Sequence, residues 1–145
     1  MILFTIGYEN HSTTSLFGRL RQHDVQFLAD VRAYPVSCRE GMSTGELRFS
    51  CKAHGMIYKD FSGFGVPASL RRQIRASCNY DLLRDEYLKL LDRRKKGLNV
   101  LRNLITANEG RACLFCYEYN PAKCHRSILA QRLKEMAPGL IITNL

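Results

Sequence analysis

The segment Ala112-Cys-Leu-Phe-Cys-Tyr117 is apolar at nearly every position, and the turn residues Asn120-Pro121 follow it. A short strand that is apolar on both faces is typical of a parallel sheet covered by helices on either side. Asparagine before proline is typical of a helix start, because proline fits the first helical position. The next apolar residues recur at helical spacing, at Ile128, Leu129, Leu133 and Met136. This part of the chain therefore predicts a strand followed by a helix, the repeating unit of an α/β protein.

The same alternation extends through the rest of the chain. Short apolar runs predict further strands at Ile2–Ile6, Val25–Val31, Met56–Tyr58 and Leu140–Thr143. Helical spacing separates these runs, with Ser12 as the N-cap of the first helix. Ser43 and Glu46 predict a capping box at the start of the second helix. We therefore expect a three-layer α/β/α, Rossmann-like fold with a mainly parallel sheet of about five strands, forming one domain over residues 1–145.

Composition and charge limit the classes of partner and compartment. The chain has 145 residues, with 22 lysines and arginines against 13 aspartates and glutamates, a formal net charge of +9. A positive balance favours anionic partners such as nucleotides, phosphates or nucleic acid. No apolar run approaches the ~18 residues of a membrane span, and the start of the chain lacks the basic flank of a signal peptide. We therefore expect a cytoplasmic protein with no membrane partner, and its six cysteines as thiols in a reducing compartment.

A run of four cations, Arg93-Arg-Lys-Lys96, interrupts the helical spacing between Leu82 and Ile105. Cations are favourable at the C-terminus of a helix, and we prefer this interpretation of the run. The alternative is a nucleic-acid-binding or accessory module that uses the basic residues of the central helices. Those residues are Arg71, Arg72, Arg75, Arg93, Arg94, Lys95 and Lys96.

Polar residues follow the predicted strands at the edge where a parallel sheet binds its ligands. The candidates from the first three strands are Tyr8, Glu9, Asp30, Arg32 and Lys59. The fourth strand and the helix after it add Cys116, Glu118, Cys124, His125, Arg126 and Ser127. Because parallel strands end at one edge, we expect five charged residues to converge in one pocket, with Cys116 and Cys124 in its wall. The five are Glu9, Asp30, Arg32, Glu118 and Arg126.

The motif Cys124-His125-Arg126 is the densest of these groups, and it falls in the predicted first turn of a helix. Helix N-termini attract anions and lower the pKa of thiols. One interpretation is therefore a cysteine- or carboxylate-dependent enzyme acting on an anionic small molecule, such as a nucleotide or nucleobase derivative. Alternatively, Cys124 is a buried packing residue and Arg126 caps loop carbonyls.

The enzyme interpretation assigns a role to each candidate. Cys124 would be the nucleophile, Glu118 or His125 the general base, and Asp30 and Glu9 further acid–base groups. The residues that would bind the substrate are Tyr8, Arg32, Lys59, Arg126 and Ser127. No G-x-G-x-x-G sequence is present, so we predict no dinucleotide cofactor. The oligomeric state stays open at this point.

A metal-binding protein is a further interpretation of the same region. One metal ion could be bound by four side chains, those of Cys116, Glu118, Cys124 and His125. Our first prediction, however, is a protein without a metal. Cys113 cannot share an ion with Cys116, because residues three apart on a strand point to opposite faces. We therefore expect Cys113 to pack in the core.

Several segments together resemble the domain-of-unknown-function 488 family. They are, in order, Thr5–Glu9, Asp30–Ser37, Gly55–Tyr58 with Phe64-Gly65, Cys116–Glu118 and Pro121–Ser127. The most specific feature is Cys-x-Glu followed by Pro-x-x-Cys-His-Arg. Family members usually have leucine where this chain has Phe64, which is a conservative departure. The resemblance implies a single α/β domain with a parallel sheet in a soluble bacterial or archaeal protein, and it implies no particular reaction.

Overall fold

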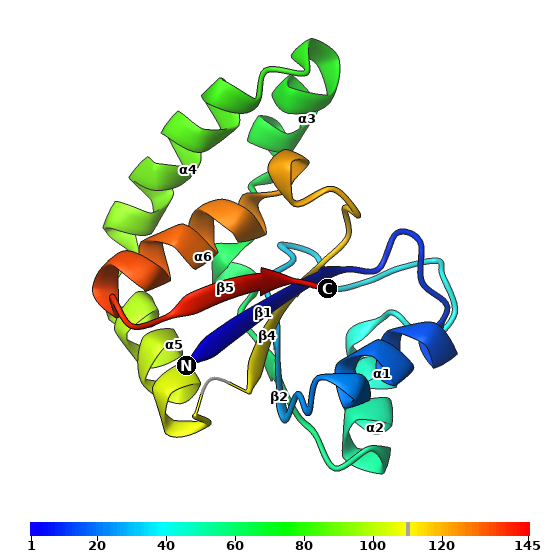
Figure 1. The fold of residues 1–145 in the computed structure, drawn as a ribbon. Helices are drawn as coiled ribbons and strands as arrows, with labels where there is room; N and C mark the ends of the chain where they lie inside the picture. Colours follow the sequence, from blue (N-terminus) through cyan, green and yellow to red (C-terminus); the bar gives the residue numbers. More distant parts are fainter. Residues whose placement is uncertain (110) are drawn as a thin grey trace.

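Five short segments form one parallel sheet in the computed structural model of the protein, which describes residues 1–109 and 111–145 (Figure 1). The strands are β1 (Ile2–Gly7), β2 (Phe27–Asp30), β3 (Ile57–Asp60), β4 (Ala112–Cys116) and β5 (Ile141–Asn144). Their order across the sheet is β3-β2-β4-β1-β5, and every neighbouring pair is parallel. The central strand β4 is buried at every position, as its continuous apolar sequence predicts. The prediction of a mainly parallel sheet of five strands is confirmed.

Helices cover both faces of this sheet (Figure 1). One face carries α1 (Thr13–Gln22) and α2 (Thr44–Ala53). The other carries α3 (Ala68–Ser77), α4 (Tyr80–Arg93), α5 (Lys95–Ala107) and α6 (His125–Met136). Two 3₁₀ turns, η1 (Ser62–Phe64) and η2 (Pro121–Lys123), follow β3 and β4. The predicted three-layer α/β/α fold is therefore confirmed. No helix within the described residues is long and apolar enough to cross a membrane.

The three inner strands, β1, β2 and β4, divide their side chains between two cores. Along β4, Cys113 and Phe115 join the core under α1 and α2, whereas Leu114 and Cys116 join the core under α3 to α6. Strand geometry requires this division, because successive side chains point to opposite faces. The predictions that Cys113 packs in the core and faces away from Cys116 are confirmed.

The start of α1 follows its sequence signal, and the start of α2 does not. Ser12 Oγ accepts a hydrogen bond from Ser15 N, and Ser15 Oγ accepts one from Ser12 N, so a capping box forms. The capping box predicted for Ser43 and Glu46 is wrong. Ser43 Oγ bonds instead to the backbone of Ser37, and Glu46 accepts from a backbone N–H of the preceding loop at 2.7 Å. The folded loop before α2 offers these side chains closer partners than the amides of the helix.

Asn120 and Pro121 begin η2 rather than α6. Asn120 Oδ1 accepts a hydrogen bond from Ala122 N at 2.9 Å, and Pro121 occupies the start of that turn. Helix α6 begins at His125 and has Cys124 as its N-cap residue. The predicted first-turn position of Cys124 is therefore corrected to the cap itself. An Asn-Pro sequence can begin either a 3₁₀ helix or an α-helix. In both, the first backbone N–H groups need a hydrogen-bond acceptor, and the fixed φ of proline suits the first turn.

Gly7 sets how closely β1 approaches the segment that follows β4. A Cβ atom at Gly7 would overlap the backbone of Glu118. Beyond the strand ends, Tyr8 N donates to the Cys116 carbonyl at 3.0 Å, so the pairing of β1 with β4 continues past Gly7. This close approach holds the backbone of Glu118 beside the carboxyl end of β1.

Candidate functional site

Three side chains form a buried group at the carboxyl edge of the sheet, which we call the thiol–imidazole centre. Cys116 is the last residue of β4, Cys124 is the N-cap of α6, and His125 is the first residue of that helix. Their exposed fractions are 4%, 2% and 5%. The two sulfurs and one imidazole nitrogen all lie within 4.8 Å of one another. The turn η2 creates this proximity, because it returns the chain from β4 to the start of α6.

The imidazole of His125 has a fixed orientation. Its Nε2 donates a hydrogen bond to the Val31 carbonyl at 2.8 Å, and a carbonyl can only accept, so Nε2 carries a hydrogen. Its Nδ1 faces both sulfurs, at 3.9 Å from Cys116 and 3.9 Å from Cys124. The ring of Tyr87 packs edge-on against the imidazole, with 5.2 Å between centroids. The ring is therefore held between β2, β4 and α4, with Nδ1 directed between the two thiols.

Glu118 borders the centre on its partly exposed side. Its Oε2 lies 3.7 Å from the sulfur of Cys116. Burial raises the pKa of Glu118 to about 7, and the negative charge of Cys124 adds to this effect. A carboxyl with such a pKa gains and loses its proton near neutral pH.

The two cysteines of the centre differ in acidity. Burial alone would raise the pKa of Cys124, but the hydrogen bond from Cys116 and the positive charges of His125 and Arg126 hold it well below the ordinary thiol value. The same hydrogen bond raises the pKa of Cys116, and burial raises it further. Burial alone would lower the pKa of His125, but the charge of Cys124 raises it above its ordinary value. In this arrangement Cys124 is the thiolate and Cys116 the thiol.

Arg126 follows the centre in sequence, and its guanidinium is occupied by the fold. The side chain is 1% exposed. Its Nε donates to Thr5 Oγ1 at 3.1 Å, and its two terminal nitrogens donate to the carbonyls of Glu118 and Tyr119 at 2.5 and 3.2 Å. These contacts match the alternative in which Arg126 caps loop carbonyls. Ser127 Oγ also bonds to backbone carbonyls, those of Pro121 and Cys124.

A second buried group, the Asp30–Arg32 pair, lies on the opposite face of the sheet. The carboxylate of Asp30 is fully buried and accepts two hydrogen bonds from the Arg32 guanidinium, at 2.9 and 2.7 Å. Arg32 also donates to the Met42 carbonyl at 2.7 Å and lies 3.4 Å from the hydroxyl of Tyr8. The hydroxyl of Tyr58 donates to Asp30 at 2.7 Å. These contacts occupy the charges of Asp30 and Arg32 within the fold.

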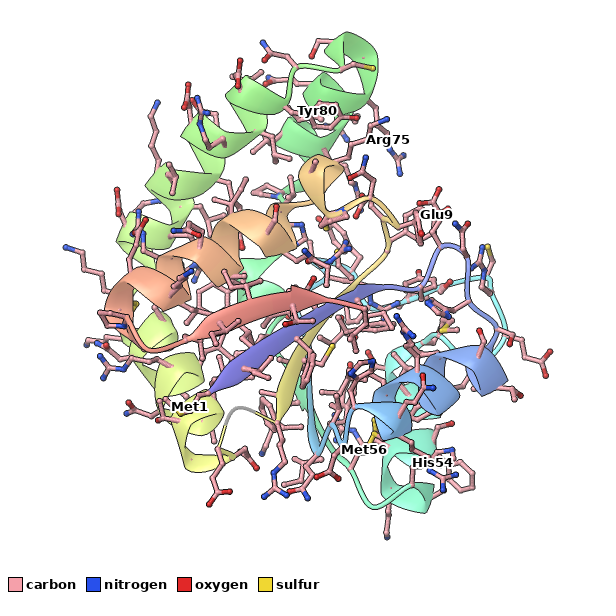
Figure 2. The ribbon with its side chains drawn as sticks, viewed as in Figure 1. Met1, Glu9, His54, Met56, Arg75 and Tyr80 are labelled. Atoms are coloured by element: carbon pink, nitrogen blue, oxygen red, sulfur yellow. The ribbon has the colours of Figure 1, made fainter. Side chains whose placement is uncertain are left out.

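The remaining candidates lie outside both groups. Glu9 is exposed beyond the carboxyl end of β1, opposite Met1 at its other end, and it accepts a hydrogen bond from Tyr119 N at 2.8 Å (Figure 2). Lys59 is exposed on the edge strand β3.

Two cavities also lie away from the thiol–imidazole centre. One, of about 670 Å³, borders the starts of α1 and α2, and the other, of about 710 Å³, borders η1 and the junction of α4 with α5.

The single pocket expected from the sequence is therefore divided between two faces. The strands do end at one edge, and β2, β4 and β1 are neighbours, as the expectation required. However, Asp30 pairs in register with Phe115, and both face α1 and α2, while Cys116 is one residue further along and faces the other side. The alternation of strand side chains separates the Asp30–Arg32 pair from Cys116 and Cys124. Val31, whose carbonyl accepts the hydrogen bond from His125, lies between Asp30 and Arg32 in sequence.

Sequence reasoning missed several partners of these groups. The imidazole of His125 depends on the carbonyl of Val31 and the ring of Tyr87, and Asp30 depends on the hydroxyl of Tyr58. A backbone carbonyl carries no sequence signal, because every residue has one. Tyr87 lies on the apolar stripe of α4, so its spacing predicts only a core position.

A parallel α/β/α fold with a buried thiol–imidazole centre at the carboxyl edge of the sheet defines the class of this protein. The chain belongs to the family described as Domain of unknown function DUF488, whose model matches residues 12–133. The match includes both buried groups and confirms the resemblance in the sequence. No curated protein and no solved structure matches the chain.

The structure predicts that Asp30 has a structural role. We expect Asp30→Ala to lower the free energy of unfolding by about 3–5 kcal/mol, because it leaves the Arg32 guanidinium buried without its counter-charge. The control is Asp60→Ala, the register partner of Asp30 on the edge strand, which is exposed and should change stability by about 1 kcal/mol or less. Urea denaturation measures both. An unchanged unfolding midpoint for Asp30→Ala would contradict the structural role and favour a catalytic one.

Proposed function

We propose that the protein binds a thiophilic divalent metal ion, with zinc as the first candidate, at the thiol–imidazole centre. Its ligands would be the sulfurs of Cys116 and Cys124 and Nδ1 of His125, with a carboxylate oxygen of Glu118 as the fourth. Thiolate and imidazole ligands are those that zinc prefers in tetrahedral sites. The proposed activity is that of a metal-dependent enzyme acting on an anionic small molecule.

The orientation of His125 is the observation that carries this proposal. A metal-bound histidine almost always donates its other ring N–H to a carbonyl or carboxylate, which fixes the tautomer and the ring. His125 Nε2 donates to the Val31 carbonyl in this way, and Nδ1 is directed between two sulfurs at equal distance. An ion bound there would take the place of the Nδ1 proton, because a metal ligand must be the neutral imidazole. A histidine that only packs in the core needs no such pair of partners.

The distances around the centre also support one tetrahedral ion. Ligand atoms that bind zinc at about 2.0–2.3 Å lie roughly 3.5–3.8 Å from one another. The observed separations are 3.9 Å from Nδ1 of His125 to each sulfur and 3.7 Å from Glu118 Oε2 to the sulfur of Cys116. Small side-chain movements would therefore bring the two sulfurs and Nδ1 of His125 to bonding distance of one ion. Glu118 lies outside this close group of three, so its side chain would have to rotate toward the ion to supply the fourth ligand.

The fourth ligand favours a catalytic over a purely structural metal. Structural zinc sites are usually closed by four cysteine or histidine ligands, whereas catalytic sites keep one position that water or substrate can take. Glu118 is the only partly exposed member of the set, so its carboxylate is the ligand that a substrate would displace. The ion would then polarise a substrate oxygen or lower the pKa of a bound water. The net charge of +9 supports an anionic substrate.

Metal content tests the proposal. The protein, purified after growth with added zinc and dialysed against a weak chelator, should retain about one zinc ion per chain. Cys116→Ser and Cys124→Ser should each lower zinc affinity by at least about tenfold, because each removes a thiolate ligand. Mass spectrometry of the metal content and a competition titration with a chromogenic chelator measure both quantities.

The matched control for these variants is Cys113→Ala, which alters a buried cysteine of the same strand that faces the other core. It should retain the metal. Circular dichroism shows whether each variant keeps its fold. Zinc retained by folded Cys116→Ser and Cys124→Ser, or no zinc in the native protein, would contradict the proposal.

A second candidate function uses the metal-free centre as a cysteine nucleophile. It is favoured by the position of Cys124 at the N-cap of α6, directly before His125 and Arg126. In this function the thiolate of Cys124 forms a bond to an electrophilic atom of an anionic small molecule, and the bond from that atom to its leaving group breaks. Glu118, on the partly exposed side, donates its proton to the leaving group. The perturbed pKa values of Cys124 and Glu118 support this role.

The pH dependence of alkylation tests this second candidate. A lowered pKa means that Cys124 is already a thiolate at low pH, so its rate with iodoacetamide should stay nearly constant between about pH 6 and 9. Free glutathione, measured in parallel, should react about tenfold faster for each pH unit below its pKa. Peptide mass spectrometry of the metal-free protein, with Cys38 and Cys78 replaced by serine, follows the rate. A rate at Cys124 that climbs in parallel with that of glutathione would exclude the thiolate.

A further inference from the structure

The cavity between the segment 60–64 and the junction of α4 with α5 has a strongly basic lining. Its volume is about 710 Å³, within the range of pockets that bind small ligands. One wall is Asp60–Phe64, which includes the partly buried Phe61, and the other is Asp92–Gly97. The second wall contains the four consecutive cations Arg93, Arg94, Lys95 and Lys96.

The acidic residues of this cavity are engaged elsewhere, and its cations are not. Asp92 forms an ion pair with Arg132 at 2.8 Å, and Asp60 accepts a hydrogen bond from Ser62 N at 2.7 Å. Among the residues that the structure describes, none of the four cations forms an ion pair. The lining therefore carries four exposed cations against two carboxylates, and the charge of one of these, Asp92, is shared with Arg132.

Two of these cations lie where they oppose the stability of the fold. Arg93 is in the last turn of α4, where a cation is favourable, as the sequence predicted. Lys95 and Lys96 instead begin α5, whose first turn holds no acidic residue. The positive end of a helix repels cations, so the preferred sequence interpretation is wrong for these two lysines. A bound anion would offset both this repulsion and the mutual repulsion of the four cations.

We propose that this cavity binds a phosphate-bearing small molecule of nucleotide size. Phosphate is the anion that clustered arginine and lysine recognise best, because they supply charge-assisted hydrogen bonds to its oxygens. The partly exposed side chain of Phe61 offers an apolar surface to the uncharged part of such a ligand. The site is distinct from the thiol–imidazole centre and does not depend on the metal proposed there.

Tyr87 connects a residue of the cavity lining with the thiol–imidazole centre. The hydroxyl of Tyr87 donates to the Phe64 carbonyl at 2.6 Å, and its ring packs against His125. Gly97 lies directly against the ring of Phe64, where a Cβ atom would be 3.1 Å from it. The cavity lining is therefore connected to the centre through Phe64 and Tyr87.

A nucleotide fits this surface better than a nucleic-acid strand. Arg75 lies near the start of α4 (Figure 2), and Arg93–Lys96 follow at its end. The basic residues between them on α4, Arg84 and Lys89, form ion pairs with neighbouring acidic residues. Helix α4 has 14 residues, so Arg75 and Arg93–Lys96 are separated by about 20 Å. The cations at the α4–α5 junction surround a cavity instead of continuing a basic stripe along one face.

Calorimetric titration with ADP, pyrophosphate and a short single-stranded oligonucleotide tests the proposal. ADP should bind, and the double variant Lys95→Gln/Lys96→Gln should weaken it by about tenfold or more, because two charge-assisted contacts are lost. The matched control Arg19→Gln/Arg21→Gln removes the same charge from the exposed last turn of α1, on the other face, and should change the affinity by about twofold or less. The melting temperature of the lysine variant should not fall, because its lysines oppose the helix dipole.

Three results would overturn the proposal. The first is the absence of binding by all three probes at low salt. The second is an equal loss of ADP affinity in the lysine variant and the arginine control, which would mean that net charge alone attracts the ligand. The third is an oligonucleotide that binds much more tightly than ADP with a steep salt dependence, which would identify a nucleic-acid surface.

Discussion

Strand β4 is buried on both faces, and the positions of both polar groups follow from this constraint. A strand inside a parallel sheet must place every second side chain in each core. Phe115 therefore packs with the Asp30–Arg32 pair, while Cys116 meets Cys124 and His125 on the other side. The pairing of β4 with β2 continues past β2, because Val31 N donates a hydrogen bond to the Phe115 carbonyl at 3.1 Å. This bond fixes the Val31 peptide, whose carbonyl accepts the hydrogen bond from His125. The candidate site depends on the register of these two strands.

The buried charges of the protein serve two different purposes. Arg32 and Arg126 hold the loops at the carboxyl edge, since each donates its hydrogen bonds to an internal carboxylate, hydroxyl or carbonyl. The thiol–imidazole centre differs, because Nδ1 of His125 and the two sulfurs face one another rather than the backbone. The groups available for chemistry are therefore the cysteines, His125 and Glu118.

Much of the fold could be predicted from sequence, because short apolar runs alternate with helical spacing along the whole chain. The strands were predicted to within a few residues, and the opposite faces of Cys113 and Cys116 followed from period two alone. The capping box at Ser43 could not be predicted, since the competing partners belong to a loop whose shape depends on tertiary packing. The division of the candidate site between two faces could not be predicted without the strand order. The sequence places Asp30 and Cys116 at one edge of the sheet, but it does not give the register of their strands. The donor set Cys116, Glu118, Cys124 and His125 followed from spacing, whereas the fixed tautomer of His125 depends on the Val31 carbonyl.

The direct test of a metal at the thiol–imidazole centre is X-ray absorption spectroscopy at the zinc edge of the purified protein. For zinc bound at this centre, we predict two sulfur atoms at about 2.3 Å and two nitrogen or oxygen atoms at about 2.0–2.1 Å from the ion. A shell made only of nitrogen and oxygen would contradict it, because such an ion would be bound at the surface and not by Cys116 and Cys124.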